Sequence, residues 1–351
     1  MSLILGIETS CDECSASVLL HHQGEFTPIS VSTFSQIALH QPYGGVVPEI
    51  ASRNHLEQIE PVVNEALSLA KVSLENIDAI SVTNRPGLIG ALLVGVSAAK
   101  ALAYASEKPL VPVHHLEGHL MSAFLKTDKG SASIPFPAVF LMVSGGHTHL
   151  HFIEEAPMLW KTSLLKDSLQ GRSLDDAAGE AFDKTAKILG FPYPGGKWMA
   201  EAAIHGNPAA FDLPRGLKQK DSLDFSFSGI KTAVSLLAKR LVAEGSLPDS
   251  LADVCASVQE AIVEPLVRKT IRLSKNKKAK AIVVVGGVAA NSRLREKLTE
   301  ESNVPVMFPD LKYCTDNAAM IAAAGAVRFA QGHGLSSEQF LKLNAFAVAE
   351  F

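Results

Sequence analysis

Short apolar runs alternate along the chain with longer segments whose apolar residues recur at helical spacing. Short apolar runs bounded by turn residues indicate buried strands. The runs predicted as strands are residues 3–7, 15–20, 77–82, 110–113, 138–143 and 279–285. Residues 147–153 are expected to return as the hairpin partner of the run at 138–143.

Helical spacing predicts the elements between these strands. The expected helices are residues 51–69, 92–105, 175–189, 251–273 and 318–329, with another beginning near Phe227. Pro265 is expected to interrupt or kink the helix that contains it. Strands that alternate with helices indicate an α/β architecture.

The pattern also indicates two halves. Residues 126–137, rich in Ser, Lys, Gly and Pro, are typical of a linker or hinge. A strand followed by a Gly/Ser loop occurs near the start of each half, at residues 6–10 and 144–148, without a repeat at the residue level. At about 150 residues per domain, a chain of 351 residues predicts two domains. Two similar α/β halves with a cleft between them would suit a nucleotide.

Composition limits the classes of protein that remain. The 32 basic and 36 acidic residues give a net charge of −4, which argues against holding nucleic acid by bulk charge alone. A local basic patch or a partner could still supply that affinity. Four cysteines exclude a disulfide scaffold. The sequence shows no targeting signal and no membrane span, so we expect a cytoplasmic protein.

Two glycine-containing loops are candidate ligand sites. Ser144, Gly145 and Gly146 follow a predicted buried strand and could cradle a phosphate with backbone N–H groups, or form a simple hairpin turn. Residues 285–291 close another strand, and Asn291 could bind a base or ribose edge, or cap the next helix. The chain has neither a Rossmann glycine pattern nor a Walker motif.

His115 and His119 are four residues apart, which places both imidazoles on one face of a helix, as a metal site requires. Glu117 would face away from that metal, so this is not a zinc-peptidase motif. The spacing alone is weak, because His147 and His151 repeat it beside His149. We interpret this second cluster as an exposed face of a hairpin.

Acidic, thiol and basic motifs each leave alternatives open. Cys11 and Cys14 form a CxxC that could be redox-active, half of a zinc site or a coincidence, and coincidence is favoured. Asp12 and Glu13 lie just past the first strand, where ligands collect in α/β sheets. Asp316 could cap a helix or bind a metal. Residues 275–280, like Lys218 and Lys220, could be a solvated face or contact RNA phosphates.

Eight motifs taken together, and in this order, resemble one family, the bacterial TsaD proteins (also called Gcp or YgjD), relatives of the Kae proteins of eukaryotes and archaea. The resemblance runs from residue 4 to about residue 330. Its motifs are residues 6–13, 114–119, 143–148, 175–186, 193–196, 225–233, 286–291 and 314–317.

The resemblance implies the two-lobed α/β fold of actin, hexokinase and Hsp70 (the ASKHA fold), with duplicated ribonuclease H-like domains. The expected lobes are residues 1–130 and 131–325, with a C-terminal helix at about 326–351 packing back on the first. It also implies a tRNA N6-adenosine threonylcarbamoyltransferase. Such an enzyme transfers the threonylcarbamoyl group of threonylcarbamoyl-AMP to N6 of the adenosine next to the anticodon (A37). The tRNAs concerned read codons that start with A, and AMP is released.

The resemblance further implies residue roles. His115, His119 and Asp316 match the ligands of one divalent metal ion, usually iron, with Zn or Mg as alternatives in vitro. Asp12 and Glu13 match catalytic acids. The positions matching substrate contacts are Met142, Val143, Ser144, Gly145, Gly146, Asp183, Gly196 and Asn291. The implied partners are tRNA, a TsaB-type paralogue and a TsaE-type ATPase, with no membrane. Lys197 and Ala200 depart from the family pattern.

Sequence features argue against three other classes of protein. An ATP-dependent phosphotransferase of the same fold would need an Asp-based catalytic loop, and the His pair and Glu8 argue against it. A metallopeptidase is disfavoured because no Glu stands next to His115. A purely structural partner subunit is disfavoured by the complete set of candidate ligands.

Overall fold

The computed structural model describes residues 1–128, 130–131, 133–156, 161, 163–217 and 221–348. The chain divides into two compact units. The first comprises Met1–Ser133, Trp160–Leu165 and Pro309–Phe351, and the second comprises Ile134–Leu159 and Lys166–Phe308. The segment 309–325, expected in the second lobe, therefore groups with the N-terminal sheet.

The first unit is built on a five-stranded sheet in the order β3-β2-β1-β4-β5. β1 pairs antiparallel with β2, and β2 with β3, whereas β4 and β5 run parallel to β1. The strands are β1 (Ser2–Glu8), β2 (Glu13–His22), β3 (Glu25–Ser35), β4 (Ala79–Arg85) and β5 (Leu110–His114).

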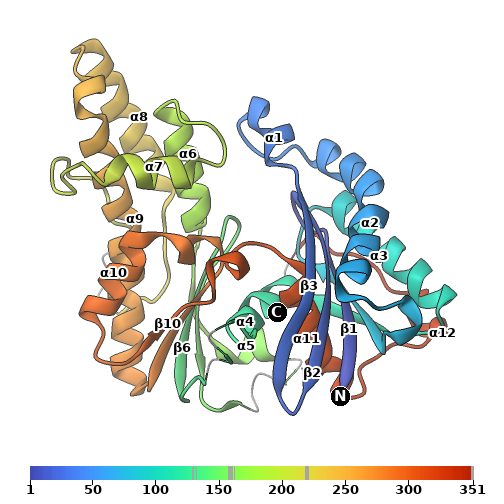
Figure 1. Ribbon diagram of the computed structural model, residues 1–351. Helices are drawn as coiled ribbons and strands as arrows, with labels where there is room; N and C mark the ends of the chain where they lie inside the picture. The colour runs from blue at the N-terminus through green and yellow to red at the C-terminus, as the bar shows by residue number, and fades with distance from the viewer. Residues whose placement is uncertain (129, 132, 157–160, 162, 218–220, 349–351) are drawn as a thin grey trace. The chain divides into compact units, whose positions relative to one another are not determined.

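Helices cover both faces of this sheet (Figure 1). Leu5 and Ile7 of β1 pack with residues of α2 and α3, whereas Ile4 packs with α11. Because side chains alternate along a strand, Gly6 and Glu8 face the same side as Ile4. The helices of this unit are α1 (Ile37–His40), α2 (Pro48–Ala70), α3 (Ile89–Ala105), α4 (His115–Ser122), α11 (Ala318–Ala330) and α12 (Ser337–Phe340).

The second unit repeats this topology. Its sheet has the order β10-β9-β6-β7-β8, in which β6, β7 and β8 are antiparallel and β9 and β10 run parallel to β6. The strands are β6 (Ala138–Val143), β7 (Thr148–Ile153), β8 (Leu169–Arg172), β9 (Ala281–Val285) and β10 (Val306–Met307). The duplication that leaves no repeat in the sequence is thus present in the strand order.

The longest helix, α9, organises the rest of the second unit. It packs on β6 and β9, and α7, α8 and α10 pack on it (Figure 1). α9 runs uninterrupted through Pro265, so the interruption expected there is absent. The helices of this unit are α6 (Ala178–Ile188), α7 (Gly195–Ala203), α8 (Ser228–Ala243), α9 (Leu247–Lys277) and α10 (Ser292–Glu301), and the boundary between the units falls within α5 (Leu164–Ser168).

The expectation that the second histidine cluster lies on an exposed face of a hairpin is wrong. β7 is an inner strand, covered along one edge by β8, which the sequence pattern did not predict. His149 is 6% exposed and His151 is fully buried. Burial lowers the pKa of each imidazole to about 3. His151 Nδ1 lies 2.9 Å from the Ser168 hydroxyl. His149 and His151 are therefore part of the interior of the unit, whereas His147, in the turn before β7, is partly exposed.

Within the described ranges, no helix combines the length and apolar character needed to cross a bilayer.

Candidate functional site

The first unit brings two histidines and a carboxylate together. α4 begins directly after β5, so its first residue, His115, is fixed at the end of a buried strand. His119 lies one turn further along the same helix. The Nδ1 atom of His114 accepts the backbone N–H of Leu116 at 3.2 Å and caps the helix start. The helical placement expected from the spacing of the pair is confirmed.

Asp316 comes from a distant part of the sequence, two residues before α11. Glycines allow α11 to reach the sheet and α4. A Cβ on Gly6 would overlap the carbonyl oxygen of Ala318, and one on Gly118 would lie 2.7 Å from Ile321 Cδ1. These close approaches carry Asp316 to the histidine face of α4.

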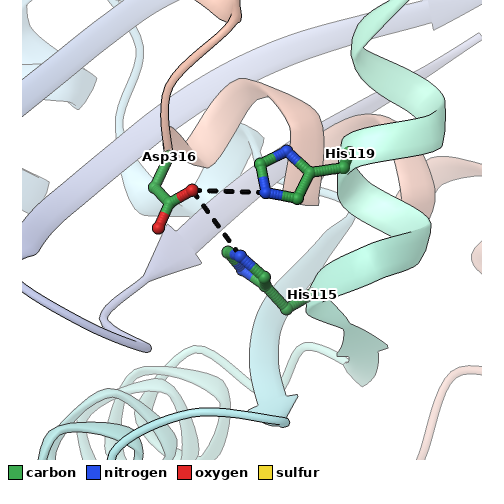
Figure 2. Close-up of side chains that lie close together, drawn as sticks. All are labelled: His115, His119 and Asp316. Carbon is green, nitrogen blue, oxygen red and sulfur yellow. Dashed lines mark ion pairs between the residues drawn. The ribbon is translucent and has the colours of Figure 1, made fainter. Parts of the chain in front are cut away.

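Figure 2 shows both imidazoles projecting from α4 toward the carboxylate of Asp316. Asp316 Oδ1 lies 3.6 Å from His115 Nε2 and 3.3 Å from His119 Nε2. The three candidate ligand atoms all lie within 4.8 Å of one another. In the part of the chain that the structure describes, this is the one group of three His, Cys, Asp or Glu side chains with that geometry.

The donor set fits a divalent metal ion. His119 is fully buried, and neither of its ring nitrogens has a hydrogen-bond partner among the described residues. A buried imidazole without a hydrogen bond costs free energy, which a metal between Nε2 and the nearby Asp316 carboxylate would recover. Two histidines and one carboxylate leave coordination positions open for a substrate.

His115 has an altered proton affinity. Burial alone would lower its pKa, but the carboxylates of Asp316 and Glu8 outweigh burial and raise the pKa to about 9. Without a metal, the His115 imidazole is therefore protonated on both ring nitrogens at neutral pH. A metal ion has to displace the proton from the nitrogen that it binds.

Glu117 faces away from the histidines, as its position on the helix predicted. Its carboxylate forms a two-pronged ion pair with Arg328 of α11, with Oε1 2.7 Å from Nη2 and Oε2 2.9 Å from Nε. Glu117 therefore ties α4 to α11 rather than acting on a substrate.

Two further acids lie between β1 and β2, Asp12 in the connecting loop and Glu13 as the first residue of β2. Asp12 is 7% exposed, and Glu13 accepts a hydrogen bond of 3.3 Å from the Ser35 hydroxyl. Burial, and then the charges of Asp12 and Asp316, raise the pKa of Glu13 well above its usual range.

The CxxC motif is not a disulfide, because all four cysteines are free. Cys14 is fully buried in β2, and burial raises the pKa of its thiol to about 12. The pKa of Cys11 is also raised, chiefly by burial. Reactive thiols have depressed pKa values, so this pair lacks the character of a redox site.

In the second unit, residues 144–146 form a tight turn after β6. The Ser144 N–H donates to the carbonyl of His147 at 2.8 Å. A Cβ on Gly145 or Gly146 would meet nothing within 4 Å, so the backbone there borders open space. Met142 and Val143, in contrast, are fully buried in β6. Their side chains anchor the loop in the core.

The glycine loop after β9 lies against the end of β6. Gly286 has φ +94°, and a Cβ there would overlap the carbonyl oxygen of Val143, so only glycine fits. Asn291 caps α10, because its Oδ1 accepts the Leu294 N–H at 3.0 Å. Its Nδ2 donates to Gln259 Oε1 at 2.8 Å. Both groups of the Asn291 side chain are therefore engaged within the protein.

Asp183 and Gly196 are also brought together in this unit. Asp183 Oδ1 accepts the N–H groups of Gly195 and Gly196, at 2.8 and 3.2 Å. The carboxylate thus stabilises the first turn of α7. On that turn, Lys197 is exposed and lies 3.9 Å from Glu201.

The basic run at the end of α9 is on the surface, with Lys275, Lys277, Lys278 and Lys280 all exposed. Lys218 and Lys220 lie outside the described residues. Sequence reasoning missed two partners of α4 residues: Glu8, which contacts His115, and Arg328, which pairs with Glu117. The only sequence signal for Glu8 is its place on β1, two residues after Gly6 and on the same face of the sheet.

The fold and the site define a class of protein. The structure is similar to component A of the (R)-2-hydroxyglutaryl-CoA dehydratase of Acidaminococcus fermentans, with a TM-score of 0.52 at 15% identity over 97% of this chain and all of that one. That likeness concerns the fold alone. With its duplicated sheet topology, the chain has the α/β ASKHA fold of actin, hexokinase and Hsp70, as the sequence predicted.

The family follows from sequence comparison. The profile of the family "tRNA N6-adenosine threonylcarbamoyltransferase" (TsaD) matches residues 28–323. Proteins of that name from Variovorax paradoxus and Anaeromyxobacter dehalogenans are 48% and 49% identical to this chain. The first match covers 96% of this chain and 93% of the relative, the second 95% and 96%. The chain belongs to the TsaD family, which confirms the resemblance seen in its motifs.

Proposed function

We propose that this chain transfers the threonylcarbamoyl group of threonylcarbamoyl-AMP to N6 of A37 in tRNAs that read codons starting with A, and releases AMP. The observation that carries the proposal is the His115, His119 and Asp316 group in a chain that matches TsaD proteins over nearly its whole length. The family name supplies the reaction, and the site supplies groups suited to it.

The donor is a mixed carbamoyl–phosphate anhydride. In the proposed reaction a bond forms between N6 and the carbamoyl carbon, the bond from that carbon to the phosphate oxygen breaks, and AMP takes the electron pair. The N6 proton leaves at the same time. N6 is a poor nucleophile because its lone pair is delocalised into the adenine ring, so the donor has to be activated.

His115, His119 and Asp316 would hold the metal, proposed as iron, with Zn or Mg as substitutes in vitro. When bound, the ion supplies positive charge that neutralises the phosphate and polarises the carbamoyl group. The three side chains orient that charge from two rigid elements, α4 and the start of α11.

Residues of the second unit are proposed to bind the donor. Backbone N–H groups of Ser144, Gly145 and Gly146 would stabilise negative charge on the phosphate or the carbamoyl oxygen. Met142 and Val143 support this, because their buried side chains fix the loop. Asp183, Gly196 and Asn291 are proposed to hold the nucleoside. Asp183 and Asn291 order the helix starts that would face it.

Asp12 and Glu13 are proposed as the catalytic carboxyl residues. One of the pair accepts the N6 proton, and the other positions the donor. The raised pKa of Glu13 keeps its proton in place at higher pH. A carboxyl group that keeps its proton cannot accept another, so the raised pKa disfavours Glu13 as the acceptor.

The proposed partners are tRNA, a TsaB-type paralogue and a TsaE-type ATPase, and the reaction is proposed to occur in the cytoplasm. The net charge of −4 supports a shared tRNA site, because bulk charge does not favour RNA.

The test is a transfer assay with purified chain, TsaB-type and TsaE-type partners, threonylcarbamoyl-AMP and unmodified tRNA. Nucleoside mass spectrometry would score the product beside a His115→Ala/His119→Ala variant. Modified adenosine with the wild type only would support the transferase and link it to the metal pair. No product from a metal-loaded wild type with competent partners would overturn the proposal, and an ATP-dependent phosphotransferase would then lead.

A further inference from the structure

We propose that Glu8 is a positioning residue of the metal site. It lies outside the ligand set and fixes the tautomer and ring orientation of His115, so that Nε2 is the nitrogen presented to the metal. This inference rests on the metal site of the proposed function, but not on the identity of the transferred group.

The contact between the two residues is direct. Glu8 is the last residue of β1 and is fully buried, on the face of the sheet that α11 covers. Its Oε2 lies 2.9 Å from His115 Nδ1. A buried carboxylate at this distance accepts a hydrogen bond from the Nδ1–H group. The other nitrogen of the ring, Nε2, then faces Asp316.

The carboxylate of Glu8 is itself held rigidly. Its Oε1 accepts the Ser10 N–H at 2.6 Å, and its Oε2 also accepts the Thr83 hydroxyl at 2.7 Å. Ser10 itself packs tightly against Gly87, because a Cβ on Gly87 would lie 2.5 Å from the carbonyl oxygen of Ser10. Glu8 therefore cannot turn away from His115 without breaking these bonds.

The two histidines differ in this respect. His115 has an acceptor for Nδ1, whereas His119 has no hydrogen-bond partner at either nitrogen among the described residues. A ligand that is oriented before the metal arrives loses less entropy on binding it, and the carboxylate makes the imidazole a stronger donor. Glu8 thus makes His115 the preorganised ligand of the pair.

Ser10 provides a weaker substitute. Its hydroxyl lies 3.2 Å from the same Nδ1 atom. In a Glu8→Ala variant this hydroxyl can still accept the Nδ1 proton, although it lacks the negative charge. The double variant Glu8→Ala/Ser10→Ala removes both acceptors and should show the full effect.

The first experiment measures metal affinity with Zn²⁺ alone, by competition with a chromophoric chelator, in the full-length chain. Outer-sphere partners of this kind typically change affinity by about 10–100-fold. We expect roughly tenfold weaker binding for Glu8→Gln, which keeps the shape but loses the charge, and a larger loss for Glu8→Ala/Ser10→Ala.

The matched control is Glu65→Gln, which removes the same charge from an exposed position on α2 of the same unit. It should bind Zn²⁺ like the wild type. Folded Glu8→Gln and Glu8→Ala/Ser10→Ala variants, with melting curves like that of the control, that bind Zn²⁺ within twofold of the wild type would overturn the proposal.

A second readout needs no Glu8 variant and therefore does not depend on their folding. Nitrogen chemical shifts of Zn²⁺-loaded wild type, labelled with ¹⁵N-histidine, report which ring nitrogen carries a proton. We expect the His115 signal, identified by its loss in His115→Gln, to show a protonated Nδ1 and a metal-bound Nε2. A metal-bound Nδ1 would refute the assignment.

Neither readout uses tRNA or threonylcarbamoyl-AMP. Failure of the transfer assay together with the expected Zn²⁺ affinities would remove the proposed reaction and leave the role of Glu8 intact. Successful transfer with unchanged Zn²⁺ affinities in the Glu8 variants would support the proposed reaction and overturn the role of Glu8.

Discussion

At the scale of single residues, the candidate metal site is marked by buried side-chain nitrogens that have no hydrogen bond. Neither ring nitrogen of His119 has a hydrogen bond, and among the described residues the one carboxylate oxygen within ion-pair distance belongs to Asp316. Asp316 therefore completes the candidate donor set of the two histidines, and its carboxylate is the negatively charged group of that set.

Replacing Asp316 by Asn should weaken Zn²⁺ binding by at least about tenfold, because the amide is a neutral and poorer ligand. Chelator competition measures this. Asp310→Asn, an exposed acid in the same segment, is the matched control and should leave the affinity unchanged. Equal affinities for the two variants would remove Asp316 from the ligand set.

The buried histidines of β7 make stability depend on pH. The pKa values of His149 and His151 are about 3 in the folded protein and about 6.5 in the unfolded chain. Their neutral forms stabilise the fold fully above pH 6.5. As pH falls from 6.5 toward 3, the free energy of unfolding decreases by up to about 1.4 kcal/mol per pH unit for each histidine.

Urea unfolding at pH 7 and pH 5 tests this prediction. We expect a smaller difference between the two pH values for His151→Gln than for the wild type. His205→Gln, at an exposed position, should behave like the wild type. The same pH difference in all three proteins would contradict the assignment.

At the scale of elements, small residues decide how closely α11 approaches β1 and α4. The approach at Gly6 leaves no room for a methyl group. Since Asp316 precedes α11 by two residues, the same packing that forms the core also sets the position of a ligand.

Gly6→Ala should therefore affect stability and metal binding together. We expect a loss of about 1–3 kcal/mol in the free energy of unfolding from overpacking, and weaker Zn²⁺ binding because the start of α11 shifts. Gly229→Ala, where a methyl group meets nothing within 4 Å, is the control and should be neutral or stabilising. Denaturation and chelator competition measure the two effects, and a Gly6→Ala protein that matches the wild type in both would refute the argument.

The ion pair of Glu117 with Arg328 joins the two helices that carry the ligands. Removing one partner leaves a buried charge unpaired, which typically costs about 3–5 kcal/mol. We expect losses of that size for Glu117→Gln and Arg328→Gln. The double variant should lose less than the sum, because no unpaired charge remains. A double-mutant cycle measured by chemical denaturation checks this, and strict additivity would contradict it.

At the scale of the whole molecule, the chain builds the same strand order twice, and each sheet carries its own helices. The hydrophobic core clusters consist of apolar residues, and the proposed metal ligands, His115 and His119 of α4 and Asp316 before α11, are not among them. Folding and metal binding are therefore separable properties.

Removing the metal with a chelator should leave the secondary structure intact, because no core depends on it. Circular dichroism should be unchanged, whereas the melting temperature should rise with the concentration of added Zn²⁺, as mass action requires for a ligand of the folded state. Transfer activity should be lost and then restored by metal. Loss of the helical signal on chelation would show instead that the metal is structural.

Most elements could be read from the sequence because their apolar residues have a clear period. The hairpin of β6 and β7, the helix carrying His115 and His119, and the small-residue helix α11 are confirmed. The strands that were missed lie at or next to sheet edges and give weak signals. β3 contains Pro28 and many polar residues, and β8 and β10 are very short. Missing β8 led to the wrong exposure for His149 and His151.

The sequence by itself determined the helical pair of imidazoles, the direction of Glu117 away from them and the family, because these depend on local spacing and on ordered motifs. Only the tertiary structure decided that Glu8 supports His115, that Arg328 pairs with Glu117, and how Asn291 and Asp183 use their side chains. Those contacts join residues far apart in the chain. Helix and sheet packing brings them together, and no local pattern encodes which distant residue will be the partner.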